Sequence, residues 1–82
     1  MTLTIIALEF QVEMDVIVKP EQRIKEVIGV LTTNFRLPPQ LGEGALQIYS
    51  RRKKCFIEEQ FTFLQAGLYQ GDVLEIKQEE RA

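Results

Sequence analysis

Cys55 is the side chain in this sequence that most resembles a reactive group. It directly follows four basic residues, Arg51, Arg52, Lys53 and Lys54, and a thiol beside positive charge is the kind that can act as a nucleophile. A nucleophilic cysteine normally also needs a base such as histidine, and the chain contains neither a histidine nor a second cysteine. We therefore expect Cys55 to serve as a small buried hydrophobic residue.

Carboxylates are the other groups that could do chemistry, and four of the twelve form two adjacent pairs, Glu58–Glu59 and Glu79–Glu80. Neither pair has the spacing with which carboxylates surround a metal ion, so both are expected to be solvated. The sequence has no glycine-rich phosphate loop and no Ser/His/Asp or Cys/His set. The lack of histidine also removes the commonest general base and the commonest zinc ligand. These observations predict that the protein is not an enzyme and has no catalytic residue, cofactor or metal site.

The basic run allows two interpretations. As the tip of a hairpin it would simply be solvated, which is the interpretation that we favour. The alternative is that Arg51, Arg52, Lys53 and Lys54 contact an acidic protein or lipid headgroups. Nucleic acid is not expected as a partner, because four residues supply few phosphate contacts and the net charge of −2 gives no overall attraction.

Size and composition predict one small domain. The chain has 82 residues, of which 45% are hydrophobic and 27% are charged, as in ordinary globular proteins. A single cysteine excludes an internal disulfide and favours a reducing compartment. The first nine residues lack the basic region of a signal peptide, and no apolar stretch approaches the roughly 20 residues that span a bilayer. We expect a cytoplasmic protein without membrane insertion, with a domain over residues 1–77 and a charged tail over residues 78–82.

The first 18 residues read as a hairpin of two strands, because apolar and polar residues alternate along them. If the reversal contained an odd number of residues, the even-numbered apolar set would share the buried face: Ile6, Leu8, Phe10, Val12, Met14, Val16 and Val18. The odd-numbered Leu3, Ile5 and Ile17 would then lie on the outer face as a protein-binding surface. The alternative is that the strand phase is wrong, since a shift of one residue exchanges the two faces.

The rest of the chain predicts one helix and three more strands. Apolar residues at helical spacing indicate a helix from about Glu21 to Phe35, with the core side made by Ile24, Val27, Ile28, Leu31 and Phe35. Pro38 and Pro39 end it. Strands follow at residues 46–49 and 55–57, then a helical turn at residues 62–68 and a strand at residues 73–77. The order is ββαββ, a short turn, then β, which predicts an α+β fold with a sheet covered by one helix.

Two segments resemble ubiquitin-like proteins. The closing segment Thr62–Ile76 contains Thr-Phe-Leu-Gln-Ala-Gly-Leu followed by Gly-Asp-Val-Leu-Glu-Ile, and the helix entry Val16–Ile28 also matches the family pattern. The chain is most similar to the YukD/EsaB family of bacterial type VII (Esx) secretion loci. This resemblance implies a β-grasp fold and a non-catalytic protein-binding role, as an accessory or regulatory component of such a secretion system. Other secretion components, or a second copy of the chain, would be its partners.

The sequence departs from ubiquitin in two respects. It ends Gln78-Glu79-Glu80-Arg81-Ala82 without the Gly-Gly pair of modifiers and sulfur carriers, so we do not expect that chemistry. The positions that match the apolar binding patch of ubiquitin hold Gln47, Glu75 and Lys77, so we expect that patch to be missing. The alternatives are a ubiquitin-like adaptor domain of a larger assembly and, less favoured, a modifier or sulfur-carrier protein.

Overall fold

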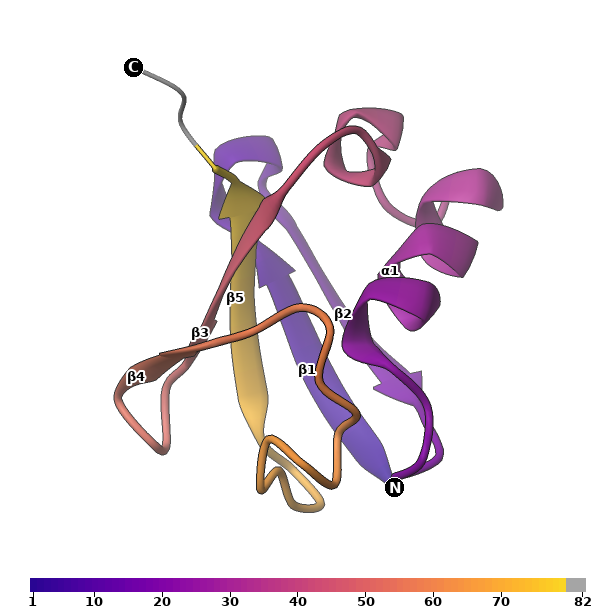
Figure 1. Cartoon of the computed structure of the whole chain (residues 1–82). Coiled ribbons are helices and arrows are strands. Elements are labelled where there is room, and N and C mark those ends of the chain that lie inside the picture. Colours follow the sequence, from indigo (N-terminus) through magenta and orange to yellow (C-terminus); the bar gives the residue numbers. More distant parts are fainter. Residues whose placement is uncertain (80–82) are drawn as a thin grey trace.

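A single mixed sheet carries one helix on one of its faces (Figure 1). The computed structural model describes residues 1–79. In chain order, the elements are β1 (Thr2–Ala7), the short 3₁₀ turn η1 (Leu8–Phe10), β2 (Val12–Ile17), α1 (Ile24–Thr33), a second 3₁₀ turn η2 (Pro39–Gly42), β3 (Leu46–Ser50), β4 (Cys55–Ile57) and β5 (Val73–Gln78).

The strands lie in the order β2-β1-β5-β3-β4. The central pair, β1 and β5, is parallel, with Thr4 beside Val73, whereas the other three pairs are antiparallel. α1 packs Ile24 and Ile28 into the core, which is completed by the inward residues of the sheet and by Phe63. The expected α+β class, the element order and the β-grasp arrangement are confirmed.

The phase that was predicted for the first strand is wrong. Ala7 pairs with Val12, so the loop between β1 and β2 holds four residues, an even number. Gln11, the last of them, closes the loop in the left-handed region at φ 54°. An even loop places the odd residues of β1 opposite the even residues of β2, and Leu3 accordingly pairs with Val16.

With the observed strand phase, two of the three residues proposed as a hairpin surface lie in the core instead. Leu3 and Ile5 are each only 1% exposed, so they cannot form a protein-binding surface in the folded domain. Ile17 lies on β2, where the predicted phase holds, and it is 85% exposed. Leu8, which was expected in the core, is exposed at the start of η1.

α1 is shorter than predicted at its N-terminal end because Arg23, directly before it, is held extended. Arg23 has φ −78° and ψ 141° and forms a bridge with Thr62. No side chain caps the helix; instead, the N–H groups of Ile24 and Lys25 donate to the carbonyls of Phe61 and Glu59. We call residues 58–64 the crossing segment, since they lie beside the start of α1 and supply these acceptors.

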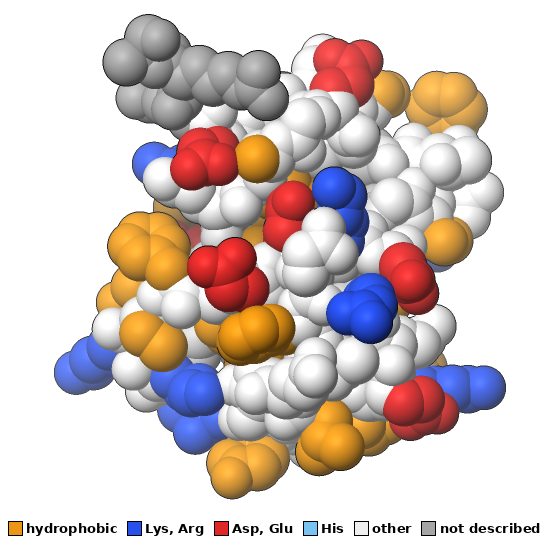
Figure 2. All heavy atoms as spheres, in the orientation of Figure 1, with side chains coloured by type: hydrophobic (Ala, Val, Ile, Leu, Met, Phe, Trp, Pro, Cys, Tyr) orange, Lys and Arg blue, Asp and Glu red, His pale blue; other side chains and the backbone are white. Residues whose placement is uncertain are grey.

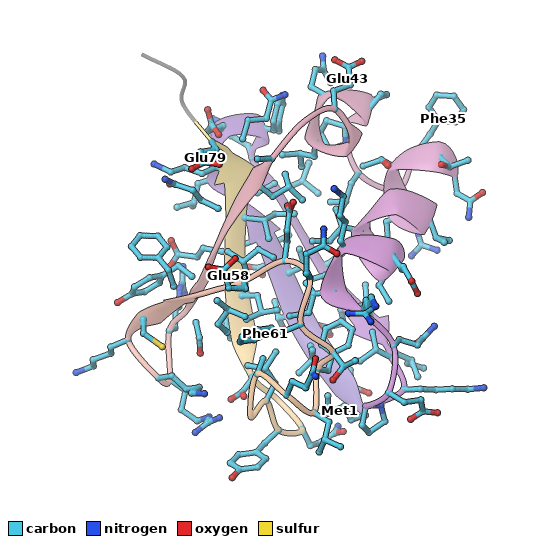
Figure 3. All side chains as sticks on the ribbon, in the orientation of Figure 1. Met1, Phe35, Glu43, Glu58, Phe61 and Glu79 are labelled. Carbon is cyan, nitrogen blue, oxygen red and sulfur yellow. The ribbon has the colours of Figure 1, made fainter. Side chains whose placement is uncertain are left out.

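Phe35 does not belong to the core side of the helix as predicted. It follows the end of α1 in the left-handed conformation, at φ 58°, and its side chain projects away from the domain (Figure 3). The N–H groups of Arg36 and Leu37 both donate to the carbonyl of Leu31, which closes the helix end. Phe35 thus occupies a position that ordinarily favours glycine.

The turn at residues 62–68 is formed by reciprocal hydrogen bonds. The Gln65 N–H donates to the Thr62 hydroxyl, and the Thr62 N–H donates to the Gln65 side chain, as in a capping box. Gly67 ends the turn at φ 68°, and Phe63 inside it is fully buried. The predicted single helical turn closed by glycine is therefore present.

The described domain extends beyond the predicted boundary at residue 77. β5 includes Gln78, and the Glu79 N–H donates to the Ala45 carbonyl. The remainder of the predicted tail, residues 80–82, lies outside the described residues. No helix formed by residues 1–79 has the length and apolar character that crossing a bilayer requires.

Two isoleucines test the corrected strand phase. Ile5→Ala should lower the free energy of unfolding by about 2–5 kcal/mol, because it leaves a cavity in the core. Ile17→Ala removes the same atoms from an exposed position and should change the free energy of unfolding by less than about 0.5 kcal/mol. Chemical denaturation of both variants measures the difference, and equal losses would contradict the assigned phase.

Phe35→Gly should stabilise the domain by about 1 kcal/mol, because glycine adopts positive φ without steric cost and little packing is lost at this exposed site. A thermal melt of the variant would show the gain. Phe35→Ala keeps a Cβ in the left-handed conformation and should show no such gain. A lower melting temperature for Phe35→Gly would mean that the ring contributes to the fold.

Candidate functional site

The outer face of the sheet, opposite α1, carries a row of paired residues that runs across four strands. Ile6 of β1 lies beside Glu75 of β5, Glu75 lies beside Tyr49 of β3, and Tyr49 lies beside Phe56 of β4. The Tyr49 and Phe56 rings meet edge to face, with centroids 5.3 Å apart. Such an arrangement fixes the orientation of both aromatic rings on the sheet.

Leu8 extends this row at the η1 end of the sheet. Together, Leu8, Tyr49 and Phe56 form what we call the outer-face cluster. Leu8 is 60% exposed and Phe56 is 68% exposed, whereas Tyr49 is half-buried between its neighbours. They line a groove of about 220 Å³ whose rim includes Glu9 and Lys77. In Figure 2, hydrophobic side chains lie at the left edge of the molecule, where Figure 1 shows β3 and β4.

Gln47, Glu75 and Lys77 occupy the positions named, so the ubiquitin patch is absent at those positions, but this face still carries apolar surface. Apolar surface comes instead from neighbouring residues that the sequence analysis did not select. The alternation of Leu46 and Ile48 as buried residues implies that Tyr49 points outward. The four-residue turn from Arg51 to Lys54 then brings Phe56 opposite Tyr49. Leu8 was missed because of the wrong strand phase.

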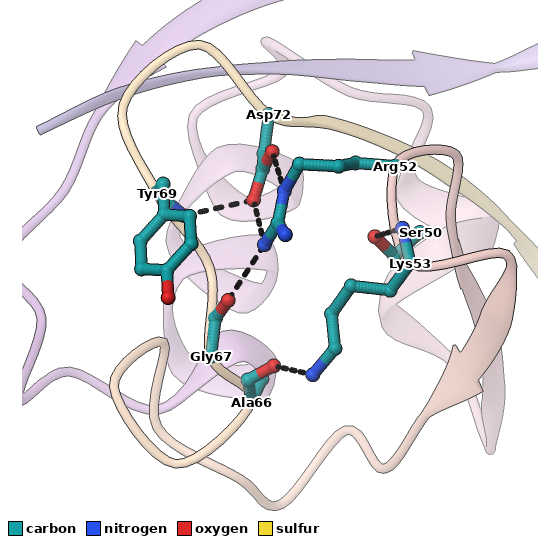
Figure 4. A network of polar contacts seen from close by, with 7 residues as sticks. All are labelled: Ser50, Arg52, Lys53, Ala66, Gly67, Tyr69 and Asp72. Carbon is teal, nitrogen blue, oxygen red and sulfur yellow. Dashed lines mark hydrogen bonds and ion pairs between the residues drawn. The ribbon is translucent and has the colours of Figure 1, made fainter.

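The basic run is mostly engaged in contacts with the chain itself. Arg51 Nε donates to Glu75 Oε2 at 2.6 Å. Arg52 donates to both carboxylate oxygens of Asp72, at 2.6 and 3.0 Å, and to the Gly67 carbonyl at 2.7 Å. Its guanidinium also lies 4.4 Å from the centre of the Tyr69 ring (Figure 4). These contacts fasten the β3–β4 turn to the loop that precedes β5.

Lys53 and Lys54 complete the run. Lys53 Nζ donates to the Ala66 carbonyl, and its backbone N–H donates to the Ser50 hydroxyl (Figure 4). Lys54 is exposed and turns the chain at φ 54°. Arg51 and Arg52 are paired with carboxylates, so they are not simply solvated as the favoured interpretation expected. The alternative, a contact with an acidic partner, is therefore restricted to Lys53 and Lys54.

Asp72, which accepts two hydrogen bonds from Arg52, is buried, with its side chain only 4% exposed. The hydrogen bond from Arg52 is the largest cause that holds the pKa of Asp72 below its usual value, and the Tyr69 N–H, which donates at 2.8 Å, acts in the same direction. Burial opposes this effect. The same hydrogen bond raises the pKa of Arg52, so both groups stay charged at neutral pH.

The remaining candidate groups are not gathered into a site. Cys55 is exposed on β4, so the expectation that it is buried is wrong. Glu59 is solvated only in part: its carboxylate accepts the Leu46 N–H at 2.9 Å and lies 3.5 Å from Lys25 Nζ. Over residues 1–79, no three potential metal-ligating side chains lie together. Glu80 lies outside the described residues.

Comparisons with known proteins define the fold. No protein-family model matches the chain, and no curated protein matches it. Among solved structures, it is similar to a ubiquitin-like protein from the hyperthermophilic archaeon Caldiarchaeum subterraneum, with a TM-score of 0.53 and 16% sequence identity over 100% of both chains. The fold is therefore a ubiquitin-like β-grasp. At this identity the likeness establishes the fold alone, and the YukD/EsaB branch remains a proposal.

Asp72→Asn should lower the free energy of unfolding at neutral pH by about 1–3 kcal/mol, because it weakens a charge-assisted hydrogen bond. The pKa of Asp72 is lowered on folding, so its contribution is complete above the unfolded value of 3.8 and is lost as the pH falls through the lower, folded value. The difference between the two proteins should therefore shrink in acid. Denaturation curves at several pH values measure it.

Asp15→Asn is the control for this experiment. Its carboxylate is exposed and accepts a hydrogen bond from the Thr4 hydroxyl at 2.7 Å. This substitution should change stability by less than about 0.5 kcal/mol at neutral pH. A deficit of Asp72→Asn that stays constant from neutral to acid pH would show that the lost stability has another source.

Proposed function

We propose that this protein is a non-catalytic binding module that contacts a partner protein through the outer-face cluster. The observation that carries the proposal is the exposure of Phe56 and Leu8 on either side of the ordered Tyr49 ring. Aromatic residues are enriched among the side chains that dominate protein interfaces. A sheet also holds them in a fixed geometry, so little conformational entropy is lost when a partner binds.

The size of the groove favours side chains of a protein over a small molecule. Its volume of about 220 Å³ is below the range of roughly 300–1,000 Å³ typical of pockets for small ligands. Complete burial of Phe56 and Leu8 would each contribute about 1.5–3 kcal/mol before the costs of association. The cluster thus suits one or two apolar side chains of a partner, with both signs of charge at the rim from Glu9 and Lys77.

The proposed setting is the bacterial cytoplasm, where the protein would be an accessory or regulatory component of a type VII secretion system. This part of the proposal is supported by the resemblance of the sequence as a whole to the YukD/EsaB family and by the ubiquitin-like fold. A fold hosts many functions and does not by itself choose among them. An adaptor domain in a larger assembly is the second candidate, because it would use the same outer-face cluster. A modifier or sulfur carrier is less favoured.

The partners of a secretion component would be encoded beside it, namely a secretion ATPase and small helical secreted proteins, whereas a carrier would have an activating enzyme there. Each purified neighbour should be titrated into the isotopically labelled domain while its NMR spectrum is recorded. A secretion partner should shift the signals of Leu8, Tyr49 and Phe56 most. Shifts confined to α1 would refute the assigned surface, and a complex with an activating enzyme would favour the carrier.

Phe56→Ser should weaken binding of that partner at least about tenfold, because one buried aromatic contact is worth more than the 1.4 kcal/mol that a factor of ten requires. Phe35→Ser is the matched control, since it removes an even more exposed ring just after the end of α1. Its affinity should be unchanged in isothermal titration calorimetry. Equal losses in both variants would show that the outer-face cluster is not the contact.

A further inference from the structure

One end of the molecule, distinct from the outer-face cluster, combines free positive charge with exposed apolar side chains. We call it the basic end and define it by Lys19, Lys53, Lys54, Leu64 and Tyr69. Hydrogen bonds join its segments: the Leu64 N–H donates to the Pro20 carbonyl at 2.9 Å. Arg52, Lys53 and their acceptors tie the β3–β4 turn to residues 66–72 (Figure 4). These three parts of the chain therefore form one fixed surface.

The charges at this end do not cancel. Arg51 and Arg52 are paired with Glu75 and Asp72, but Lys53 bonds to a neutral carbonyl and forms no salt bridge with the described residues. Lys19 and Lys54 are exposed, and Glu21 is the exposed carboxylate that lies nearest to Lys19 in the chain. Blue side chains are concentrated toward this end and red ones toward the other, where Glu43 and Glu79 lie (Figures 2 and 3). The domain is therefore electrically polarised although its net charge is only −2.

Apolar side chains project from the same end. Leu64 is 70% exposed and Tyr69 is 64% exposed, and both belong to the segment between β4 and β5. The Tyr69 ring is held by the Arg52 guanidinium, which lies over it. Tyrosine is favoured at the boundary between lipid and water, where its ring is apolar and its hydroxyl remains hydrated.

We propose that the basic end docks reversibly on an anionic phospholipid surface. Leu64 and Tyr69 enter the headgroup region, and the three lysines lie above the lipid phosphates. Each basic residue near an anionic membrane gains attraction from its surface potential, and buried apolar side chains add to it. The acidic opposite end is repelled, so the polarised domain binds in one orientation and presents the far end of β5 away from the membrane.

A lipid surface suits these residues better than an acidic peptide does. The cations of this end that have no carboxylate partner among residues 1–79 are lysines, whose compact charge is attracted by a diffuse negative field. Arginine, by contrast, binds a carboxylate through the two parallel hydrogen bonds of its planar guanidinium. Arg51 and Arg52, which directly precede Lys53 in the chain, already use their guanidinium groups in internal contacts. An acidic peptide would also leave exposed Leu64 without a complementary surface.

The test is flotation of the full chain with phosphatidylserine-containing vesicles and, separately, with pure phosphatidylcholine vesicles. We expect binding to the anionic vesicles alone, with a loss as salt concentration rises. Lys54→Glu should weaken it roughly tenfold, because it removes one attractive charge and adds a repulsive one. Arg36→Glu changes the net charge equally at an exposed site outside the basic end and should have little effect. Leu64→Ser should weaken binding, whereas Phe35→Ser, which also removes an exposed apolar side chain, should not.

Several outcomes would overturn the proposal. These are the absence of binding to anionic vesicles, equal binding to both vesicle types, or equal losses in Lys54→Glu and Arg36→Glu, which would reflect net charge alone. Binding to polyglutamate but not to vesicles would assign the basic end to an acidic polypeptide instead. Phe56→Ser should bind vesicles like the unmodified protein, so this experiment fails or succeeds independently of the outer-face cluster.

Discussion

The position of α1 on the sheet depends on the crossing segment, residues 58–64. Its carbonyls accept the first N–H groups of the helix, while the Phe63 and Leu64 N–H groups donate to carbonyls before the helix. Glu59 adds bonds to Leu46 of β3 and to Lys25 of α1. Phe63, within the crossing segment, is fully buried in the core. The first N–H groups of a helix have no acceptor within the helix, and leaving them unpaired at a buried position is costly. Here carbonyls that are distant in the sequence accept them.

Local signals explain why much of the fold was predictable. The apolar spacing of Ile24 and Ile28 identified the helix, the two prolines set its approximate end, and Gly67 marked the closing turn. The start of α1 was placed too early because its caps come from Phe61 and Glu59, more than thirty residues further along the chain. No rule that examines neighbours alone finds such acceptors. The exposed Phe35 was misplaced since its spacing matches the helix although its backbone leaves it.

The candidate site was less predictable than the fold. It depends on whether the β1–β2 loop has an even or odd number of residues, and on which strands pair in the sheet. One residue more or less in the loop after Ala7 exchanges the core and outer faces of β1, and the sequence has no Asn-Gly or Asp-Gly there to fix its length. The basic run was visible, but its two neutralising partners, Asp72 and Glu75, are brought to it only by the sheet. Likewise, Phe56 becomes part of a surface only when β4 pairs with β3.

The parallel pairing of β1 with β5 has a consequence for how the protein is made. These central strands are contributed by the first and last elements of the domain, with Thr4 beside Val73. While the ribosome is still synthesising the chain, Leu3 and Ile5 have no neighbour on that side until Leu74 has emerged. Contacts between such distant residues close slowly, because the entropy of the intervening loop is lost before the contacts form. The sheet therefore cannot be completed before β5 has emerged, and until then the nascent β1–β2 hairpin is the stretch that needs protection from aggregation.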